Sequence, residues 1–103
     1  MKVLAIESSC DETAVAKIEG GGDSLILEKN AIYSQIDIHK KYGGVVPEVA
    51  ARKHLETIIP LVDDTLGKDK LKDVDYLAVT SGPGLITSLL LGMTVAKTLA
   101  YIN

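Results

Sequence analysis

Short apolar runs separated by polar or glycine-rich turns make up the first third of the chain. Residues 2–7 (KVLAIE) are mostly apolar strand formers and predict a buried strand. Residues 13–19 (TAVAKIE) largely alternate between apolar and polar side chains, which predicts a second strand joined to the first by a polar turn. The glycine-rich loop 20–23 leads into a third predicted strand, residues 24–34, with a bulge expected near Asn30. We therefore expect three consecutive antiparallel strands.

A longer periodic pattern follows the loop at residues 35–46. Pro47 suits the first turn of a helix, and the apolar residues after it recur every three or four positions as far as Leu66. This spacing predicts a helix with one apolar face. Pro60 lies inside the pattern and predicts a kink, and Gly67 is expected to end the helix.

The last part of the chain predicts one more strand and one more helix. Residues 74–80 (VDYLAVT) predict the strand, and the Ser81–Gly84 turn separates it from a helix at residues 85–101. That helix is apolar on most sides, which is typical of a buried helix. The expected order is β-β-β-α-β-α, in which a crossover helix adds the fourth strand as a parallel strand. The predicted fold class is α/β.

The composition is that of one small globular domain. The chain has 103 residues, 47% apolar and 24% charged, which excludes a disordered segment. Its net charge of -3 argues against non-specific binding to nucleic acid. The apolar stretch 76–95 is interrupted by proline and glycine, so we expect no membrane span and a soluble, cytoplasmic protein. One cysteine and two distant histidines make a self-contained zinc site unexpected.

The turn between the first two predicted strands, residues 8–12, carries more reactive groups than a turn needs. We call it the acidic turn. Ser8 and Ser9 can donate hydrogen bonds to phosphate oxygens, while Asp11 or Glu12 can orient water, bind a hard cation or act as a base. An ordinary polar hairpin turn is the alternative, because Ser and Asp are common turn residues. Cys10 has no basic neighbour in sequence and is interpreted as a small packed thiol.

Two further segments are weaker candidates. The Gly82–Gly84 segment precedes a helix, whose amino terminus can bind an anion, but its spacing matches no nucleotide-binding loop. Basic clusters at residues 39–41 and 52–54 flank a glycine pair and could contact phosphates. A strand-to-helix turn and solvated surfaces are the respective alternatives.

Three motifs together resemble one known family. They are IESSCDET (6–13), YGGVVPEVAARKH (42–54) and SGPGL (81–85) with the helix that follows. In this order they are similar to the amino-terminal part of the TsaD/Gcp/YgjD family, formerly called O-sialoglycoprotein endopeptidase or glycoprotease. The resemblance covers essentially the whole chain. It implies an actin/Hsp70/sugar-kinase-like (ASKHA, ribonuclease H-like) fold, with residues 1–103 forming part of the first subdomain.

The resemblance also implies an activity. Family members transfer threonylcarbamoyl from threonylcarbamoyl-AMP to N6 of the adenosine beside the anticodon in tRNAs that read ANN codons. Implied cofactors are a divalent metal (iron, zinc or magnesium) and threonylcarbamoyl-AMP or ATP. Implied partners are tRNA, a paralogous subunit, and an ATPase or kinase subunit. Two alternatives stay open, namely a non-catalytic scaffold or binding module of the same fold, and the metalloprotease of the older name.

Matched residue by residue, the family motif assigns roles to the acidic turn and its surroundings. Asp11 and Glu12 are the expected catalytic pair, and the expected phosphate- or nucleotide-binding residues are Ser8, Ser9 and Thr13. His39, Lys40 and Lys41 are candidate contacts at the cleft or with tRNA. The two predicted helices match the region that pairs with the paralogue.

The sequence departs from the family in one respect. The family's metal ligands, two histidines of an H-x-E-G-H motif and a distant Asp, have no counterpart in these residues. We therefore predict a fragment of the first domain that lacks metal ligands, binds no cofactor tightly and is inactive alone. An exposed helix face predicts a homodimer of the fragment.

Overall fold

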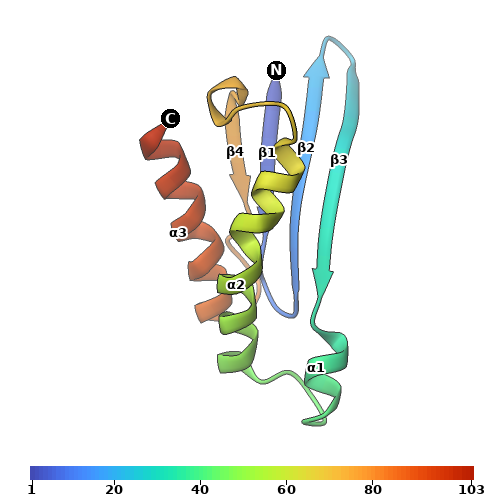
Figure 1. Ribbon diagram of the computed structural model, residues 1–103, viewed down its shortest axis with the longest axis vertical. Coiled ribbons are helices and arrows are strands. Elements are labelled where there is room, and N and C mark those ends of the chain that lie inside the picture. The colour runs from blue at the N-terminus through green and yellow to red at the C-terminus, as the bar shows by residue number, and fades with distance from the viewer.

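The computed structural model describes residues 1–103 and shows a four-stranded sheet with two long helices packed on it (Figure 1). The sheet order is β3-β2-β1-β4. The strands are β1 (Lys2–Glu7), β2 (Glu12–Gly21), β3 (Ser24–Ser34) and β4 (Tyr76–Val79). The helices are α1 (Ile36–Lys40), α2 (Pro47–Leu66) and α3 (Ile86–Ile102), with a short 3-10 helix η1 (Leu71–Asp73) before β4. The α/β class is confirmed.

The pairing of the strands agrees with the sequence pattern. β1 pairs antiparallel with β2 and parallel with β4, and β2 pairs antiparallel with β3. Lys17 pairs with Lys29 while Ile18 pairs with Leu27, so Glu28 is an extra residue in β3. This bulge lies two residues from the predicted position at Asn30. β2 is longer than predicted because β3 offers it partners as far as the hairpin turn.

Helix α2 was predicted with the correct bounds. It begins at Pro47 and stops at Gly67, which has a φ of 60° and donates its N–H to the Asp63 carbonyl. Glycine adopts this left-handed conformation without the steric cost that a side chain brings. The helix continues through Pro60 as one element. Its buried face packs on the strands to form the core, which comprises Leu4, Ile6, Val15, Ile58, Val62, Leu66, Val74 and Ala96.

Two predictions about local structure were wrong. The predicted loop 35–46 contains α1, whose five residues are too few to show a helical period. The strand predicted at 74–80 is shortened to β4, and at its start the Val74 N–H donates to the Leu71 carbonyl of η1.

Helix α3 is not the buried helix that its composition predicts. Only Ser88, Leu89, Gly92 and Ala96 are buried along it. Leu90 is 53% exposed and Tyr101 is 91% exposed. The helix touches α2 and the sheet along a single stripe, and nothing in this chain covers its other sides. No helix of the chain combines the length and apolar character needed to span a lipid bilayer.

An ionic cluster fixes the end of α2 to the sheet. The Lys17 ammonium donates to the Leu66 carbonyl at 3.2 Å and to the Asp69 carboxylate at 2.9 Å. Lys2 reaches the same carboxylate at 3.2 Å. Hydrogen bonds from these two lysines lower the pKa of Asp69. One carboxylate thereby links β1 and β2 to the segment that follows α2.

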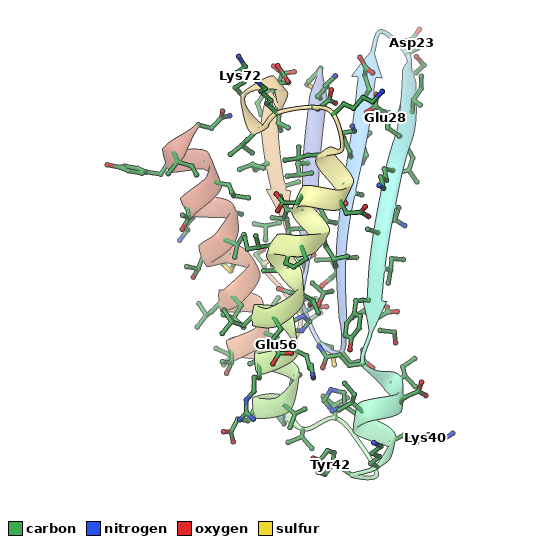
Figure 2. The ribbon with its side chains drawn as sticks, in the orientation of Figure 1. Asp23, Glu28, Lys40, Tyr42, Glu56 and Lys72 are labelled. Atoms are coloured by element: carbon green, nitrogen blue, oxygen red, sulfur yellow. The ribbon has the colours of Figure 1, made fainter.

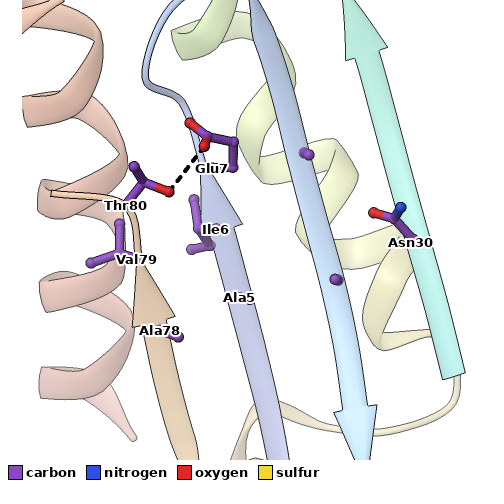
Figure 3. A pocket seen from close by; sticks show the side chains of 9 residues that line it. Ala5, Ile6, Glu7, Asn30, Ala78, Val79 and Thr80 are labelled. Carbon is purple, nitrogen blue, oxygen red and sulfur yellow. Dashed lines mark hydrogen bonds between the residues drawn. The ribbon is translucent and has the colours of Figure 1, made fainter. Parts of the chain in front are cut away.

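The other face of the sheet is uncovered in this chain. It holds a shallow groove of about 400 Å³ (Figure 3). Its lining includes Asn30 and small side chains of three strands, namely Ala5, Ala14, Ala16 and Ala78.

Candidate functional site

Two turns that are distant in sequence meet at the carboxyl ends of the parallel strands β1 and β4. The Leu85 N–H donates to the Ser9 carbonyl at 2.7 Å, which joins the turn before α3 to the acidic turn. A side chain at Gly84 would place its Cβ only 2.5 Å from that carbonyl oxygen. The carboxyl ends of parallel strands are the usual ligand-binding edge of α/β sheets. Two of the three sequence motifs therefore form one structural unit.

The acidic pair lies on this unit with both carboxylates unpaired. Asp11 is half-buried, Glu12 is exposed, and neither side chain makes a hydrogen bond or an ion pair. The Asp11 main chain is fixed, because its carbonyl accepts the Gln35 N–H at 2.8 Å. Asp11 also lines a pocket of about 330 Å³ together with His39 and Lys40. A fixed backbone with free carboxylates is suited to engage a ligand.

Ser8 and Thr13 make internal hydrogen bonds. Both are fully buried. Ser8 Oγ donates to the Ser88 carbonyl at 2.8 Å, and Thr13 Oγ1 lies 2.7 Å from His54 Nδ1. Their expected contact with phosphate stays a prediction, and it would require these bonds to open. Half-buried Ser9 lies nearer the surface of the same turn.

Glu7 is a residue of the site that the sequence analysis missed. Burial raises the pKa of this carboxyl, but hydrogen bonds from Ser9 and Thr80 outweigh that effect and lower it. Its Oε2 accepts the Thr80 hydroxyl at 3.1 Å (Figure 3), and its Oε1 accepts the Ser9 N–H. An ionised Glu7 therefore holds both turns. The available signal was a carboxylate at the end of an otherwise apolar strand.

The predicted basic contacts divide into one buried and two exposed residues. His39 Nε2 lies 2.7 Å from Gln35 Oε1, and its Nδ1 accepts the Val46 N–H at 3.1 Å. The ring thus fixes α1 to the loop that follows it. Lys40 and Lys41 are exposed, and of these two Lys40 lines the pocket of Asp11. Contact of all three with a cleft ligand or tRNA stays a prediction.

The basic cluster 52–54 is divided in the same way. Its His54 is fully buried beneath the acidic turn, and burial lowers the pKa of the imidazole. Cys10, above it, is half-buried. Burial, together with the negative charges of Asp11 and Glu7, raises the pKa of its thiol. A thiol that stays protonated agrees with its interpretation as a packed side chain.

The residues of this chain do not complete a metal site. Hard cations take six or more oxygen ligands, and zinc takes four nitrogen, sulfur or oxygen ligands. No group of three His, Cys, Asp or Glu side chains lies close enough to share an ion. Both histidine rings use both nitrogens in internal bonds, which leaves the acidic pair alone.

The chain is an α/β domain with two unpaired carboxylates at the carboxyl edge of its parallel strands. Comparison with known proteins identifies its family. Residues 26–102 match the family model of TsaD, tRNA N6-adenosine threonylcarbamoyltransferase. The chain belongs to this family. Proteins with that name are 57% identical in Kosmotoga olearia, 53% in Protochlamydia amoebophila and 52% in Staphylococcus epidermidis. These alignments cover 96–97% of this chain but only 29–30% of the relatives, so the chain spans less than a third of their length.

Solved structures confirm the fold. A Pseudomonas aeruginosa protein described as similar to peptidase YeaZ superposes with a TM-score of 0.69 and 24% identity. A second structure, YeaZ from the same organism, gives 0.65. Each alignment covers 98% of this chain and 38–39% of the other. The predicted α/β fold class is confirmed by these superpositions. The ASKHA-like character of the domain and the assignment of residues 1–103 to its first subdomain stay predictions.

Proposed function

We propose that this chain forms the amino-terminal part of a transferase that moves threonylcarbamoyl onto N6 of an adenosine in tRNA. The 57% identity to the Kosmotoga olearia enzyme supports this reaction class. The proposed donor is threonylcarbamoyl-AMP, and the proposed acceptor is the adenosine beside the anticodon in tRNAs reading ANN codons. The proposed location is the cytoplasm. The observation that carries the proposal is the pair of unpaired carboxylates at the sheet edge.

The chemistry of that reaction needs groups that this site offers. The N6 amine attacks the carbonyl carbon of the mixed anhydride, AMP leaves, and the amine must lose a proton. A positioned carboxylate is a suitable base for that proton. Asp11 and Glu12 have no internal partner that would compete for this role. Ser9 belongs to the same turn and Lys40 lines the pocket of Asp11, so both are candidate donors to the phosphate of the leaving AMP.

The remaining components implied by the family stand as proposals for the longer protein. These are a divalent metal, ATP, tRNA contacts and an ATPase or kinase subunit. The step described above uses none of them. We propose that the 103 residues alone do not catalyse transfer, because they offer the acidic pair without a complete site.

A segment exchange tests the proposal. The matching segment of the Kosmotoga olearia transferase is replaced by these 103 residues, and threonylcarbamoyl transfer to tRNA is measured. We expect activity within about tenfold of the parent, because the segments are 57% identical. The control exchange uses the equivalent segment of the Pseudomonas aeruginosa YeaZ, which shares the fold at 24% identity. Loss of activity with both segments would contradict the proposed function and favour a non-catalytic scaffold.

The exposed face of α2 and α3 is the proposed contact with a paralogous subunit of similar fold. Ile59 of α2 and residues of α3 line a small apolar groove of about 120 Å³ between the helices. Leu55, 62% exposed, and Leu90, 53% exposed, extend this apolar surface. Neighbouring exposed apolar side chains are typical of protein interfaces. A homodimer through the same face is the competing possibility for the isolated chain.

Replacing Leu90 by Glu is expected to weaken the paralogue contact at least about tenfold, because the interface would have to bury a charge. The unfolding free energy should change by no more than about 0.5 kcal/mol, since the side chain is exposed. Affinity for the paralogous Kosmotoga olearia subunit is measured by calorimetry on the exchanged protein. Leu25→Glu, at a 79% exposed leucine of β3, is the matched control. Equal affinity for both variants would exclude this face.

A further inference from the structure

We propose that His54 is a positioning residue that sets the conformation of the acidic turn. Its catalytic significance rests on the proposed function, but its effect on the turn does not. The imidazole is fully buried on α2, directly beneath the turn. In the sequence it belongs to the basic cluster 52–54, and the proposed transfer step makes no direct use of it.

One ring holds both sides of the acidic pair. His54 Nε2 lies 2.8 Å from the Cys10 carbonyl oxygen, and Nδ1 lies 2.7 Å from Thr13 Oγ1. Cys10 and Thr13 are the residues immediately before Asp11 and immediately after Glu12. Because the two bonds bracket the pair, they fix the path of the backbone that carries both carboxylates.

The geometry selects a single form of the ring. The Cys10 carbonyl can only accept a hydrogen bond, so Nε2 must carry a proton. Burial lowers the pKa of His54, which favours the neutral ring with an unprotonated Nδ1. Nδ1 then accepts the Thr13 hydroxyl, and Thr13 Oγ1 accepts the Thr57 hydroxyl at 3.0 Å. The hydrogen bonds thus connect Thr57 of α2 to Thr13 of β2, Thr13 to His54 of α2, and His54 to Cys10 of the acidic turn.

Substitutions at position 54 can separate the effect of the two hydrogen bonds on the turn from the effect of side-chain packing. In His54→Leu, the Cys10 carbonyl and the Thr13 hydroxyl lose a partner inside the protein, which favours movement of the turn. In His54→Gln, the side-chain amide offers a donor and an acceptor in place of the two ring nitrogens. Val62→Ala is a matched control, because Val62 is a core residue of the same helix, 3% exposed, and has no bond to the turn.

The first measurement is made on the unaltered chain. Nitrogen-15 spectra of the imidazole at pH 7 should show one neutral tautomer, protonated at Nε2. A mixture of tautomers, or a charged ring, would overturn the proposal, because a charged ring has no acceptor for the Thr13 hydroxyl. This readout does not depend on whether any variant folds.

The second measurement uses Cys10, the only thiol in the chain, as a reporter on the turn. We expect His54→Leu to raise the rate of alkylation by iodoacetamide on the order of tenfold, because local opening exposes the half-buried thiol. His54→Gln should return the rate to within about twofold of the original. Acceleration by Val62→Ala equal to that of His54→Leu, or no rescue by Gln, would show a role in general stability only.

These readouts are independent of transferase activity. If the exchanged protein fails to modify tRNA while the tautomer and the rescue are as expected, the proposed function fails and the positioning role stands. If transfer is retained while the tautomer or the rescue is not found, only the positioning role is overturned.

Discussion

Asp11→Asn in the exchanged transferase is expected to lower kcat about 10²- to 10⁴-fold, the range typical of a lost general base. Asparagine has nearly the same shape as aspartate but cannot accept the proton that the attacking amine must lose. The unfolding free energy should stay within about 0.5 kcal/mol, because the Asp11 carboxylate has no hydrogen bond or ion pair to lose. Single-turnover transfer and urea unfolding measure the two quantities.

Asp23→Asn provides the control for this result. Asp23 is exposed at the β2–β3 hairpin, and Figure 2 shows it at the opposite end of the molecule from Lys40, which lines the pocket of Asp11. This variant should keep its activity. Glu12→Gln is measured in the same way, and its kcat shows how much each carboxylate contributes to catalysis. Full activity in both Asp11→Asn and Glu12→Gln would remove the acidic turn from the chemistry.

The sequence predicts the regular elements of this fold because their packing produces a clear period. The third strand and α2 have the predicted bounds. Pro47 and Gly67 mark the two ends of α2, and the glycine-rich turn marks the start of the third strand. Helix α1 could not be predicted, because five residues do not show a period. The burial of α3 was predicted wrongly. An apolar helix indicates that other residues pack around it, but its sequence does not show whether those residues belong to this chain.

The candidate site divides in the same way. The acidic turn is visible in the sequence because its reactive groups are neighbours along the chain. The support beneath it is not visible, because His54 reaches Cys10 across 44 residues and Thr80 reaches Glu7 across 73. Such partners depend on how strands and helices pack, and a single sequence carries no local sign of that packing.

Gly84→Ala is expected to destabilise the chain by about 1–3 kcal/mol, the usual cost of forcing an extra group into a filled space. The new Cβ would lie 2.5 Å from the Ser9 carbonyl oxygen and 2.8 Å from Ser9 Cβ. No change of rotamer relieves a clash with the backbone of the acidic turn. The two turns must therefore move apart, which breaks the bond from the Leu85 N–H to Ser9 and displaces Asp11 as well.

Gly21→Ala is the matched control, because a Cβ at Gly21 meets nothing within 4 Å and the residue does not need a positive φ. Urea unfolding of both variants measures the difference in stability, and transfer by the exchanged protein measures the displacement of the carboxylates. Equal stability would show that the two turns are loosely joined. A stability loss with unchanged transfer would show that the acidic pair acts independently of the turn before α3. Loss of both is expected, because the backbone contact between Gly84 and Ser9 joins the SGPGL motif to the turn that carries the proposed base.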